Sequence, residues 1–589
     1  MLERLFEHLT YLDWAIILGY FVFAVALGMY HSRKATSSID EYFASGRSAP
    51  WWILGTSMVA TTFAADTPLA VSALVVTSGI AGNWYWWCLA MGSVLAVFFH
   101  ARLWRRTEVL TDAELVEFRY SGQPASVLRG FRALYFGIVY NCIVIGWVNL
   151  AMTKILGETL GLEKMTSVFI CFLITVVYTS LSGVIGVMVT DFLQFSIAMF
   201  GAIYLAVASV RGIGGIGAII GKLGEVYGAE KASAMTSFIP PFESGAVGLV
   251  TMPLAFFLVY IGLQWWSTGN TDGGSYFAQR MLSAKDERHS MLGFLWFNVA
   301  HYCLRPWPWI VVGLVAAVMF PYVKGADGVM PDPELGYIKV MLHFLPVGVL
   351  GLMMASFLAA YMSTIDTHLN WGASYLVNDF YKRFLVRDAT QRHYILISVV
   401  ATIIIALCGA VFTYLNKSIV GAWMLLSQIN AGIGAFYLLR WYWWRVNAWT
   451  EITSIVTTLC VTAILKFGFP QIKFPITLVY TVPVSIIVAV IVTYLTAPVS
   501  SEKLVQFYRK VRPGGPGWRY VVTKYMPGEK LDPIPASRVL CFVAGVCAVY
   551  SALYGIGKIV LGAPGIGVIF LAVAVLCGAY IWSVLSGEK

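Results

Sequence analysis

Long apolar segments follow one another along most of the chain, separated by shorter polar or charged segments. A helix needs roughly 20 mostly apolar residues to cross the hydrocarbon core of a bilayer. These segments are apolar on every side and do not alternate with polar residues, so the pattern predicts transmembrane helices and not barrel strands. We predict spans at about 11–31, 50–78, 82–104, 131–156, 164–182, 186–211, 247–270, 291–321, 345–377, 392–415, 418–440, 449–467, 474–497, 537–561 and 565–585.

Two of the predicted spans are interrupted by polar residues and helix breakers. The second contains the hydroxyl-rich run 61–68 with Pro68, and the seventh ends in the glycine-rich run 267–274. Proline and clustered hydroxyls weaken the backbone hydrogen bonds of a helix. The interruptions lie five spans apart, which favours two inverted repeats with a binding site at mid-membrane. Ordinary proline or glycine kinks are the alternative.

The charges are few and lie mainly between the spans. Only 12% of the 589 residues are charged, about half the usual share for a soluble chain, and the net charge is +10. The basic loops all fall on one side if every span crosses once, and the positive-inside rule places that side in the cytoplasm. We therefore expect the N-terminus outside, the C-terminus inside, and no nucleic-acid partner. The basic residues are Arg33, Lys34, Arg47, Arg102, Arg105, Arg106, Arg119, Arg129, Arg132, Arg280, Lys285, Arg288, Lys382, Arg383, Arg387, Arg392, Arg440 and Arg445.

The order of spans and loops predicts a transporter core followed by a separate pair of helices. The outer loops near 212–246 and 322–344 are too short for an ordinary folded domain. No HExxH or GxSxG motif occurs, so we expect no enzyme, and nothing indicates an obligate protein partner. We predict a core over 1–497 (helix zero at about 11–31, repeats at about 50–211 and 247–440, further helices at about 449–497), a basic cytoplasmic linker over 498–536 that contains the proline- and glycine-rich run 513–517, and a transmembrane hairpin over 537–589.

Four ionisable residues lie inside apolar runs or at their edges: Asp66, Asp191, Arg305 and Asp366. A charge near mid-bilayer costs about 2.5–3.5 kcal/mol on insertion scales, so such residues usually face a cavity, a partner charge or an ion. For Arg305 the alternative is a side chain that extends to the membrane interface. For Asp191 it is a carboxylate at a helix N-terminus, stabilised by the helix dipole.

The surroundings of Asp366 are the richest in oxygen. Ser363, Thr364, Asp366 and Thr367 occupy little more than one helical turn, and their spacing makes several of them neighbours. Hard cations prefer oxygen ligands, so this turn suits an alkali cation. The alternative is hydroxyls that bond to their own helix, with Asp366 as a cap or paired with His368. The tryptophan-rich runs 84–87 and 441–444 are typical of membrane-interface belts.

Several motifs together resemble the sodium/solute symporter family, which includes the sodium/glucose, sodium/proline and sodium/sialic acid transporters. They occur in order, at the spacing of the family, across spans zero to twelve. The motifs are Gly-Thr-Ser-Met-Val-Ala at 55–60, Tyr178-Thr179 with Thr190-Asp191 and Gln194, Gln-Arg-Met-Leu-Ser-Ala-Lys-Asp at 279–286, and Met362-Ser363-Thr364 followed by Asn370 and Asp379-Phe380-Tyr381.

The resemblance implies an all-α polytopic membrane protein with a leucine-transporter-type (LeuT-type) fold: two inverted five-helix repeats, one extra N-terminal helix and additional C-terminal helices. It also implies a sodium site between helices one and eight, formed by the carbonyls of Ala60, Phe63 and Ala360 and the hydroxyls of Ser363 and Thr364. A possible second sodium site would use Asp191, Ser363, Asp366 and Thr367. Relatives usually carry Ser or Thr where Asp366 stands, and the second carboxylate could tighten the site or make it proton-sensitive.

This sequence also departs from the family pattern. The glycine pair before helix five is Ser182-Gly183, the helix-two glutamate that binds sugar aligns with Trp86, and the loop after Trp265-Trp266 carries an insertion. Arg305 aligns approximately with a lysine that touches substrate in sugar-transporting relatives, and a guanidinium suits a carboxylate. The candidate solute-binding residues are Thr62, Asp66, Thr67, Trp86, Asn141, Gln264, Trp265, Arg305 and Gln428.

The resemblance predicts a secondary symporter of the cell (inner or plasma) membrane. It would couple inward sodium movement to uptake of a small organic solute by alternating access, with an amino acid or organic acid favoured. A proton-coupled symporter and a sugar symporter on the same fold are the main alternatives. A membrane solute sensor is a weaker one.

Overall fold

The computed structural model describes residues 8–35, 47–109, 111–179, 184–241, 252–322 and 332–587. Within these ranges the chain is helical, and its only β-contact is a single bridge between Ala49 and Ala284. In the described part of the chain, nine helices are long and apolar enough to cross a membrane, or up to 12 spans if each of three bent pairs counts as one. Three shorter apolar helices fall at the remaining predicted spans, so every predicted span coincides with a helix.

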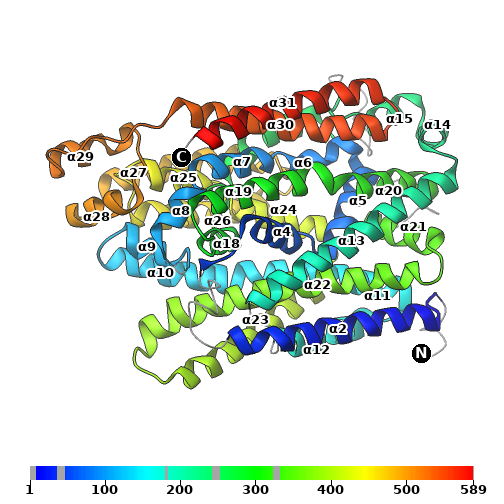
Figure 1. Cartoon of the computed structure of the whole chain (residues 1–589), viewed down its shortest axis with the longest axis horizontal. Helices are drawn as coiled ribbons and strands as arrows, with labels where there is room; N and C mark the ends of the chain where they lie inside the picture. The colour runs from blue at the N-terminus through cyan, green and yellow to red at the C-terminus, as the bar shows by residue number, and fades with distance from the viewer. Residues whose placement is uncertain are drawn as a thin grey trace.

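The helices run along the long axis of the molecule, as Figure 1 shows. The N-terminus, α14, α15 and α21 lie at one end, and α9, α28 and α29 lie at the other. The span-forming elements are α2 (Tyr11–Ala35), α4 (Trp51–Thr61), α5 (Asp66–Ser78), α6 (Trp84–Trp87), α7 (Leu89–Phe99), α8 (Ala101–Thr107), α10 (Gln123–Leu134), η3 (Tyr135–Tyr140), α11 (Asn141–Leu160), α12 (Lys164–Thr179), α13 (Val184–Ile213), α16 (Leu254–Val259), η5 (Tyr260–Gln264), α17 (Trp265–Ser267), α18 (Tyr276–Leu282), α19 (Glu287–Asn298), η6 (Val299–Leu304), α20 (Pro306–Met319), α22 (Val349–Ser374), η8 (Tyr375–Leu385), α23 (Gln391–Leu415), α24 (Ile419–Ile429), α25 (Ile433–Tyr442), α26 (Ala448–Gly468), α27 (Thr477–Leu495), α30 (Ala536–Val560) and α31 (Pro564–Gly587).

The remaining helices connect the spans at the two ends. At the end that holds the N-terminus, α14 (Ile216–Tyr227), α15 (Ala229–Thr236) and α21 (Gly336–Phe344) lie between spans. At the other end are α9 (Glu114–Arg119), α28 (Ser501–Val511) and α29 (Arg519–Tyr525). The last two lie inside the predicted linker, so the proline- and glycine-rich run there joins short helices. We call the two ends the outer and inner ends, respectively, after the orientation expected from the sequence.

Both interruptions expected from the sequence are real. The axis turns by 61° between α4 and α5, and residues 268–275 separate α17 from α18. Two further spans are bent: α8 departs by 53° from the segment Ile80–Phe99, and α25 by 47° from α24. The sequence analysis did not predict these two bends, although His100 lies at the first and the polar run 427–432 with Gly432 lies at the second.

The N-terminal helix α2 (helix zero) is fixed to α22 (helix eight) by one buried carboxylate. Asp13 accepts hydrogen bonds from the backbone N–H groups of Gly348 and Gly351, both at 2.7 Å. These groups belong to the first turn of α22, where free N–H groups and the helix dipole favour an anion. A Cβ at Gly351 would lie 2.5 Å from the Asp13 Cα, so glycine permits the close approach.

Three expectations about polar and aromatic residues were wrong. Arg129 and Arg132 lie in α10, which continues through η3 into α11, because this span extends far beyond its apolar centre. Arg440 lies within α25 and is 2% exposed, because buried carboxylates surround it. The run 84–87 is mostly inside the protein, since the C-terminal hairpin covers this face: Tyr550 donates to the Trp87 carbonyl at 2.9 Å.

Candidate functional site

The break between α4 and α5 results from a hydroxyl that bonds to its own helix. Thr62 donates to the carbonyls of Val59 (2.8 Å) and Met58 (3.1 Å). Such bonds compete with the backbone ladder and bend a helix. The chain resumes as α5 at Asp66, with Pro68 in the first turn, where a missing N–H has no cost. The carbonyls freed at the break must therefore find other partners.

One of these partners comes from helix eight, which is α22 when the N-terminal helix is counted as zero. The hydroxyl of Thr364 in α22 donates to the carbonyl of Thr61 at 3.1 Å, and this places helix eight directly against the break. Ser363, one residue earlier, and Ala360, one turn earlier, are at most 3% exposed. Ala60 and Phe63 on the facing segment are equally buried, at 3% and 4%. The five residues predicted for the first sodium site therefore lie on two buried segments that contact each other.

The second predicted sodium site is described only in part, because the side chain of Asp191 lies outside the described residues. Asp366 is fully buried and accepts from the Asn370 amide at 2.9 Å. The Nδ1 atom of His368 lies 2.7 Å from the Asn141 amide oxygen. The guanidinium of Arg280 donates to the Thr367 hydroxyl at 3.3 Å. A sodium ion at this place would share Thr367 with a fixed positive charge.

Arg305 is the second partner of the freed carbonyls. It is 1% exposed, so the interface alternative does not apply. Its guanidinium donates to the carbonyls of Val59 (3.1 Å) and Thr62 (2.9 Å) and to the Thr62 hydroxyl (3.1 Å). A cation at the C-terminal end of α4 is favoured by the helix dipole. Among the described residues, its Nε atom has no hydrogen-bond partner.

Asp66 begins the other half of the broken helix and is also buried. Its Oδ2 atom accepts from the Trp423 indole at 2.9 Å, which links α5 to α24. Its Oδ1 atom has no hydrogen-bond partner among the residues that the structure describes. A buried acceptor without a partner costs free energy, so a bound donor at this oxygen would be stabilised.

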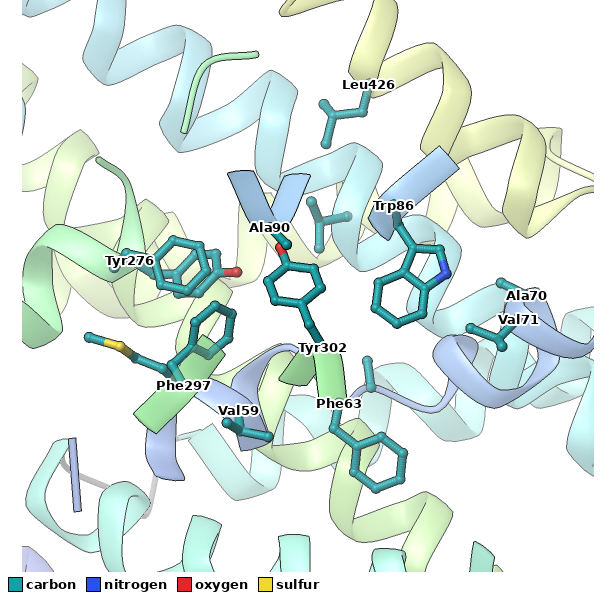
Figure 2. Close-up of a cluster of buried hydrophobic side chains, with 14 of the residues drawn as sticks. Val59, Phe63, Ala70, Val71, Trp86, Ala90, Tyr276, Phe297, Tyr302 and Leu426 are labelled. Atoms are coloured by element: carbon teal, nitrogen blue, oxygen red, sulfur yellow. The ribbon is translucent and has the colours of Figure 1, made fainter. Parts of the chain in front are cut away.

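Aromatic side chains surround the break, as Figure 2 shows. Tyr302 of η6 lies in the middle of this cluster, stacked on Trp86 with ring centroids 5.9 Å apart. Phe297 lies edge-on to Tyr302 at 6.2 Å, and Tyr276 of α18 lies on the same side. Phe63 points away from Tyr302 and stacks on Trp309 at 5.2 Å. The cluster thus contains residues of helices one, two, six and seven.

The other predicted solute-binding residues differ in how free they are. Gln264 is fully buried and donates to the Tyr85 carbonyl at 2.7 Å, while its Oε1 atom has no partner in the described part of the chain. Asn141 donates to the Phe136 carbonyl at 2.8 Å, so both ends of its amide are occupied.

The remaining candidates are Trp265, Gln428 and Thr67. Trp265 is partly exposed. Gln428 is partly exposed, and its carbonyl accepts from Thr462 of α26 at 3.4 Å. Thr67 is buried and donates to the Thr62 carbonyl at 3.4 Å.

The sequence did not indicate Tyr276, Phe297 and Tyr302 of this cluster, nor two further residues that contact the break and Asp66. Trp423 holds Asp66 and stacks on Tyr85 at 6.2 Å. The Nδ1 atom of His301 lies 3.0 Å from the Thr62 hydroxyl. A histidine inside an apolar run could have indicated the second residue. Nothing in the sequence distinguishes Trp423 from other buried tryptophans.

Comparison with known proteins agrees with this geometry. The model of the sodium:solute symporter family matches residues 42–457. The sodium/glucose cotransporter of Vibrio parahaemolyticus is 24% identical over 510 residues, which are 82% of this chain and 90% of the relative. The human sodium/glucose cotransporter 4 is 25% identical over 500 residues, 78% of this chain and 70% of the relative. The human sodium/myo-inositol cotransporter 2 is 23% identical over 492 residues, with 78% and 70% covered.

A solved structure has the same arrangement of helices. The Na+-coupled sialic acid symporter in its substrate-bound outward-open state superposes with a TM-score of 0.65 at 18% identity, covering 83% of this chain and 99% of that chain. The broken first and sixth helices, the additional N-terminal helix and the C-terminal helices define a LeuT-type fold of two inverted five-helix repeats. The chain belongs to the sodium:solute symporter family.

Proposed function

We propose that this protein takes up a small organic solute by alternating access, driven by sodium that binds between helices one and eight. The 3.1 Å bond from the Thr364 hydroxyl to the Thr61 carbonyl is the observation that supports this most directly. A sodium ion here would take its oxygen ligands from both helices: the carbonyls of Ala60, Phe63 and Ala360 and the hydroxyls of Ser363 and Thr364. Binding would complete the solute site beside the break, and release at the inner end would free it.

We propose that the inner end faces the cytoplasm and that the protein resides in the cell (inner or plasma) membrane. Basic residues at this end support the orientation: Arg106 donates to the Val511 carbonyl of α28, and Arg383 pairs with Glu117 of α9. The N-terminus is then outside and the C-terminus inside. With about 100 mV and a tenfold sodium gradient, each sodium ion supplies ~3.7 kcal/mol. This allows roughly 500-fold accumulation of a neutral solute.

We propose an amino acid or an organic acid as the solute, and the two buried charges of the site support an amino acid in particular. Asp66 and Arg305 flank the break, and each keeps one polar atom without a partner among the described residues. An ammonium group near Asp66 and a carboxylate near Arg305 would satisfy both. An organic acid would satisfy Arg305 alone.

Two alternatives rest on specific observations. A sugar is favoured by the names of the relatives, which are cotransporters of glucose and myo-inositol. Sugar hydroxyls both donate and accept, so they could also serve Asp66 and Gln264. Proton coupling is favoured by Asp366, a buried carboxylate where relatives usually have a hydroxyl. A second sodium ion could instead be bound by Asp191, Asp366 and Thr367. Protons and this sodium ion would then compete for the same carboxylates.

Uptake by proteoliposomes separates these possibilities. Vesicles are loaded with potassium buffer and given a sodium gradient, a pH gradient or neither, and are tested with labelled amino acids, organic acids, glucose and myo-inositol. We expect accumulation of an amino acid or organic acid only with the sodium gradient. Accumulation with the pH gradient alone would favour proton coupling. Ligand binding without transport under any gradient would favour a sensor.

A further inference from the structure

Five charged side chains form a buried cluster at the inner end, which we call the inner ion network: Asp112, Arg132, Asp272, Arg440 and Glu451. All are at most 4% exposed. Arg440 lies 2.5 Å from Asp272, and Arg132 lies 3.2 Å from Asp112. Glu451 lies between the two arginines, 3.7 Å from Arg440 and 3.8 Å from Arg132.

Asp272 is the member that belongs to the broken sixth helix. It lies in residues 268–275, the loop that separates α17 from α18. Its Oδ2 atom accepts from Arg440 and from the Trp441 indole, the latter at 2.9 Å. Its Oδ1 atom accepts from the Gly274 amide at 3.1 Å, and its carbonyl accepts from the Trp104 indole at 2.8 Å. Every acceptor of this residue is thus occupied.

A second contact holds the same loop. The backbone N–H of Ser275 donates to Asp112 at 3.1 Å. Ser275 has a φ of 67°, a conformation that a residue with a side chain rarely adopts. Strained backbone of this kind persists only where its surroundings hold it, and it is common in segments that move. The two contacts connect the sixth-helix break to helix ten through Arg440, and further ion pairs with Arg132 and Glu451 extend the network to helices three and eleven.

The cluster is nearly balanced in charge, and a third arginine completes it. Arg119 of α9 donates from Nε to the Arg440 carbonyl at 2.8 Å. Its guanidinium lies 5.1 Å from the Phe507 ring and 5.0 Å from the Trp518 ring. Buried charges are tolerated when they are paired and hydrogen-bonded, and losing one partner is costly. Releasing Asp272 into a water-filled opening would provide it with new hydrogen bonds.

We propose that Asp272 is a positioning residue of the transport cycle: its bonds to Arg440 and Trp441 hold the inner half of helix six closed, and their release opens the inner end. This inference rests on the proposed alternating-access function. Helix six separates from helix ten in the inward-open state, and water replaces the arginine as the partner of the carboxylate.

Amide hydrogen exchange of the full-length protein in lipid nanodiscs tests the proposal, first in potassium buffer without sodium. We compare the wild type with Asp272→Asn and with Trp441→Phe, which removes a single donor. Asp388→Asn is the matched control, because Asp388 is an exposed acid at the same end. We expect the amides of 276–282 to exchange at least about tenfold faster in Asp272→Asn, since a hydrogen bond to a charged group is lost. Trp441→Phe should show a smaller increase there, and Asp388→Asn none.

The outcomes distinguish a local contact that holds the inner half of helix six closed from a general contribution to stability. Unchanged exchange at 276–282 in a folded Asp272→Asn protein would overturn the proposal. If that variant exchanges faster everywhere, Trp441→Phe decides, and the absence of a local increase would again overturn it. Sodium is then added to all variants. If the substitutions speed exchange at 276–282 but sodium changes the exchange of none of the proteins, the role of Asp272 stands and the sodium-coupled function is contradicted.

Discussion

Thr364 and Thr61 join the eighth helix to the break of the first through a 3.1 Å hydrogen bond. The acceptor is a carbonyl that the broken helix cannot use, and the donor is a hydroxyl that could have bonded to its own helix. Both residues are at most 3% exposed, so neither oxygen can turn to water. A sodium ion that displaces this hydrogen bond would have the Thr364 hydroxyl oxygen available as a ligand.

Thr364→Val keeps the shape of the side chain and removes the hydroxyl. We expect the sodium concentration for half-maximal uptake to rise about tenfold or more, which corresponds to ~1.4 kcal/mol for one lost ligand. Uptake at varied external sodium measures this. A variant with the sodium dependence of the wild type would show that Thr364 has only a structural role.

Asp191→Asn tests the possible second cation site. Removing the carboxylate should raise the sodium concentration for half-maximal uptake about tenfold, because a charged ligand binds a cation more strongly than an amide. Expression should stay normal. The same variant is assayed with a pH gradient in the absence of sodium. Wild-type sodium affinity in this variant would remove Asp191 from the site.

Arg305→Lys should impair the protein although the charge is kept. The guanidinium serves three acceptors at the end of α4, and a lysine ammonium cannot reproduce this planar fork. Leaving buried carbonyls without partners costs about 1–3 kcal/mol. Thermal unfolding with and without solute should show a lower midpoint and a smaller solute-induced shift. Arg387→Lys, at an exposed arginine, is the control and should change neither.

Glu117 provides a prediction about pH at the inner end. Burial raises the pKa of Glu117, but hydrogen bonds from Ser126, Arg383 and Arg129 outweigh it and hold the pKa at about 2. Because the folded-state pKa lies below the ordinary value of 4.5, its stabilisation is fully present above that value and is lost as the pH falls through about 2. Glu117→Gln should therefore lower the unfolding midpoint by the same amount at pH 5 and pH 8. A difference that changes between these two values would contradict the assignment.

Much of the fold could be predicted from the sequence, because the bilayer imposes length and apolarity on each span. Helix one was recognisable as broken, since Thr62 and Pro68 act through local chemistry. The extent of α10 was not, because Arg129 and Arg132 look like loop residues until the carboxylates that pair with them are known. Those partners include Asp379, which is distant in sequence.

The candidate site divides in the same way. Ser363 and Thr364 could be located because hydroxyls next to a carboxylate are rare in an apolar helix. The partners of Arg305 could not, because its three acceptors follow from a helix break and not from residue type. The inner ion network joins Asp112 to Glu451 through contacts between distant segments, and composition alone gives no pairing. Arg440 and Glu451 carried a usable signal, since both are charges at the edge of an apolar run.

The most direct test of the central claim is equilibrium binding of ²²Na+ to the purified protein, compared with Ser363→Ala and with Ser356→Ala. Ser356 is a buried serine of the same helix that donates to the Met353 carbonyl at 2.9 Å, so it controls for loss of a hydroxyl in α22. The account predicts saturable sodium binding by the wild type and by Ser356→Ala, and at least about tenfold weaker binding by Ser363→Ala. Equal binding by all three proteins would contradict a sodium site between helices one and eight.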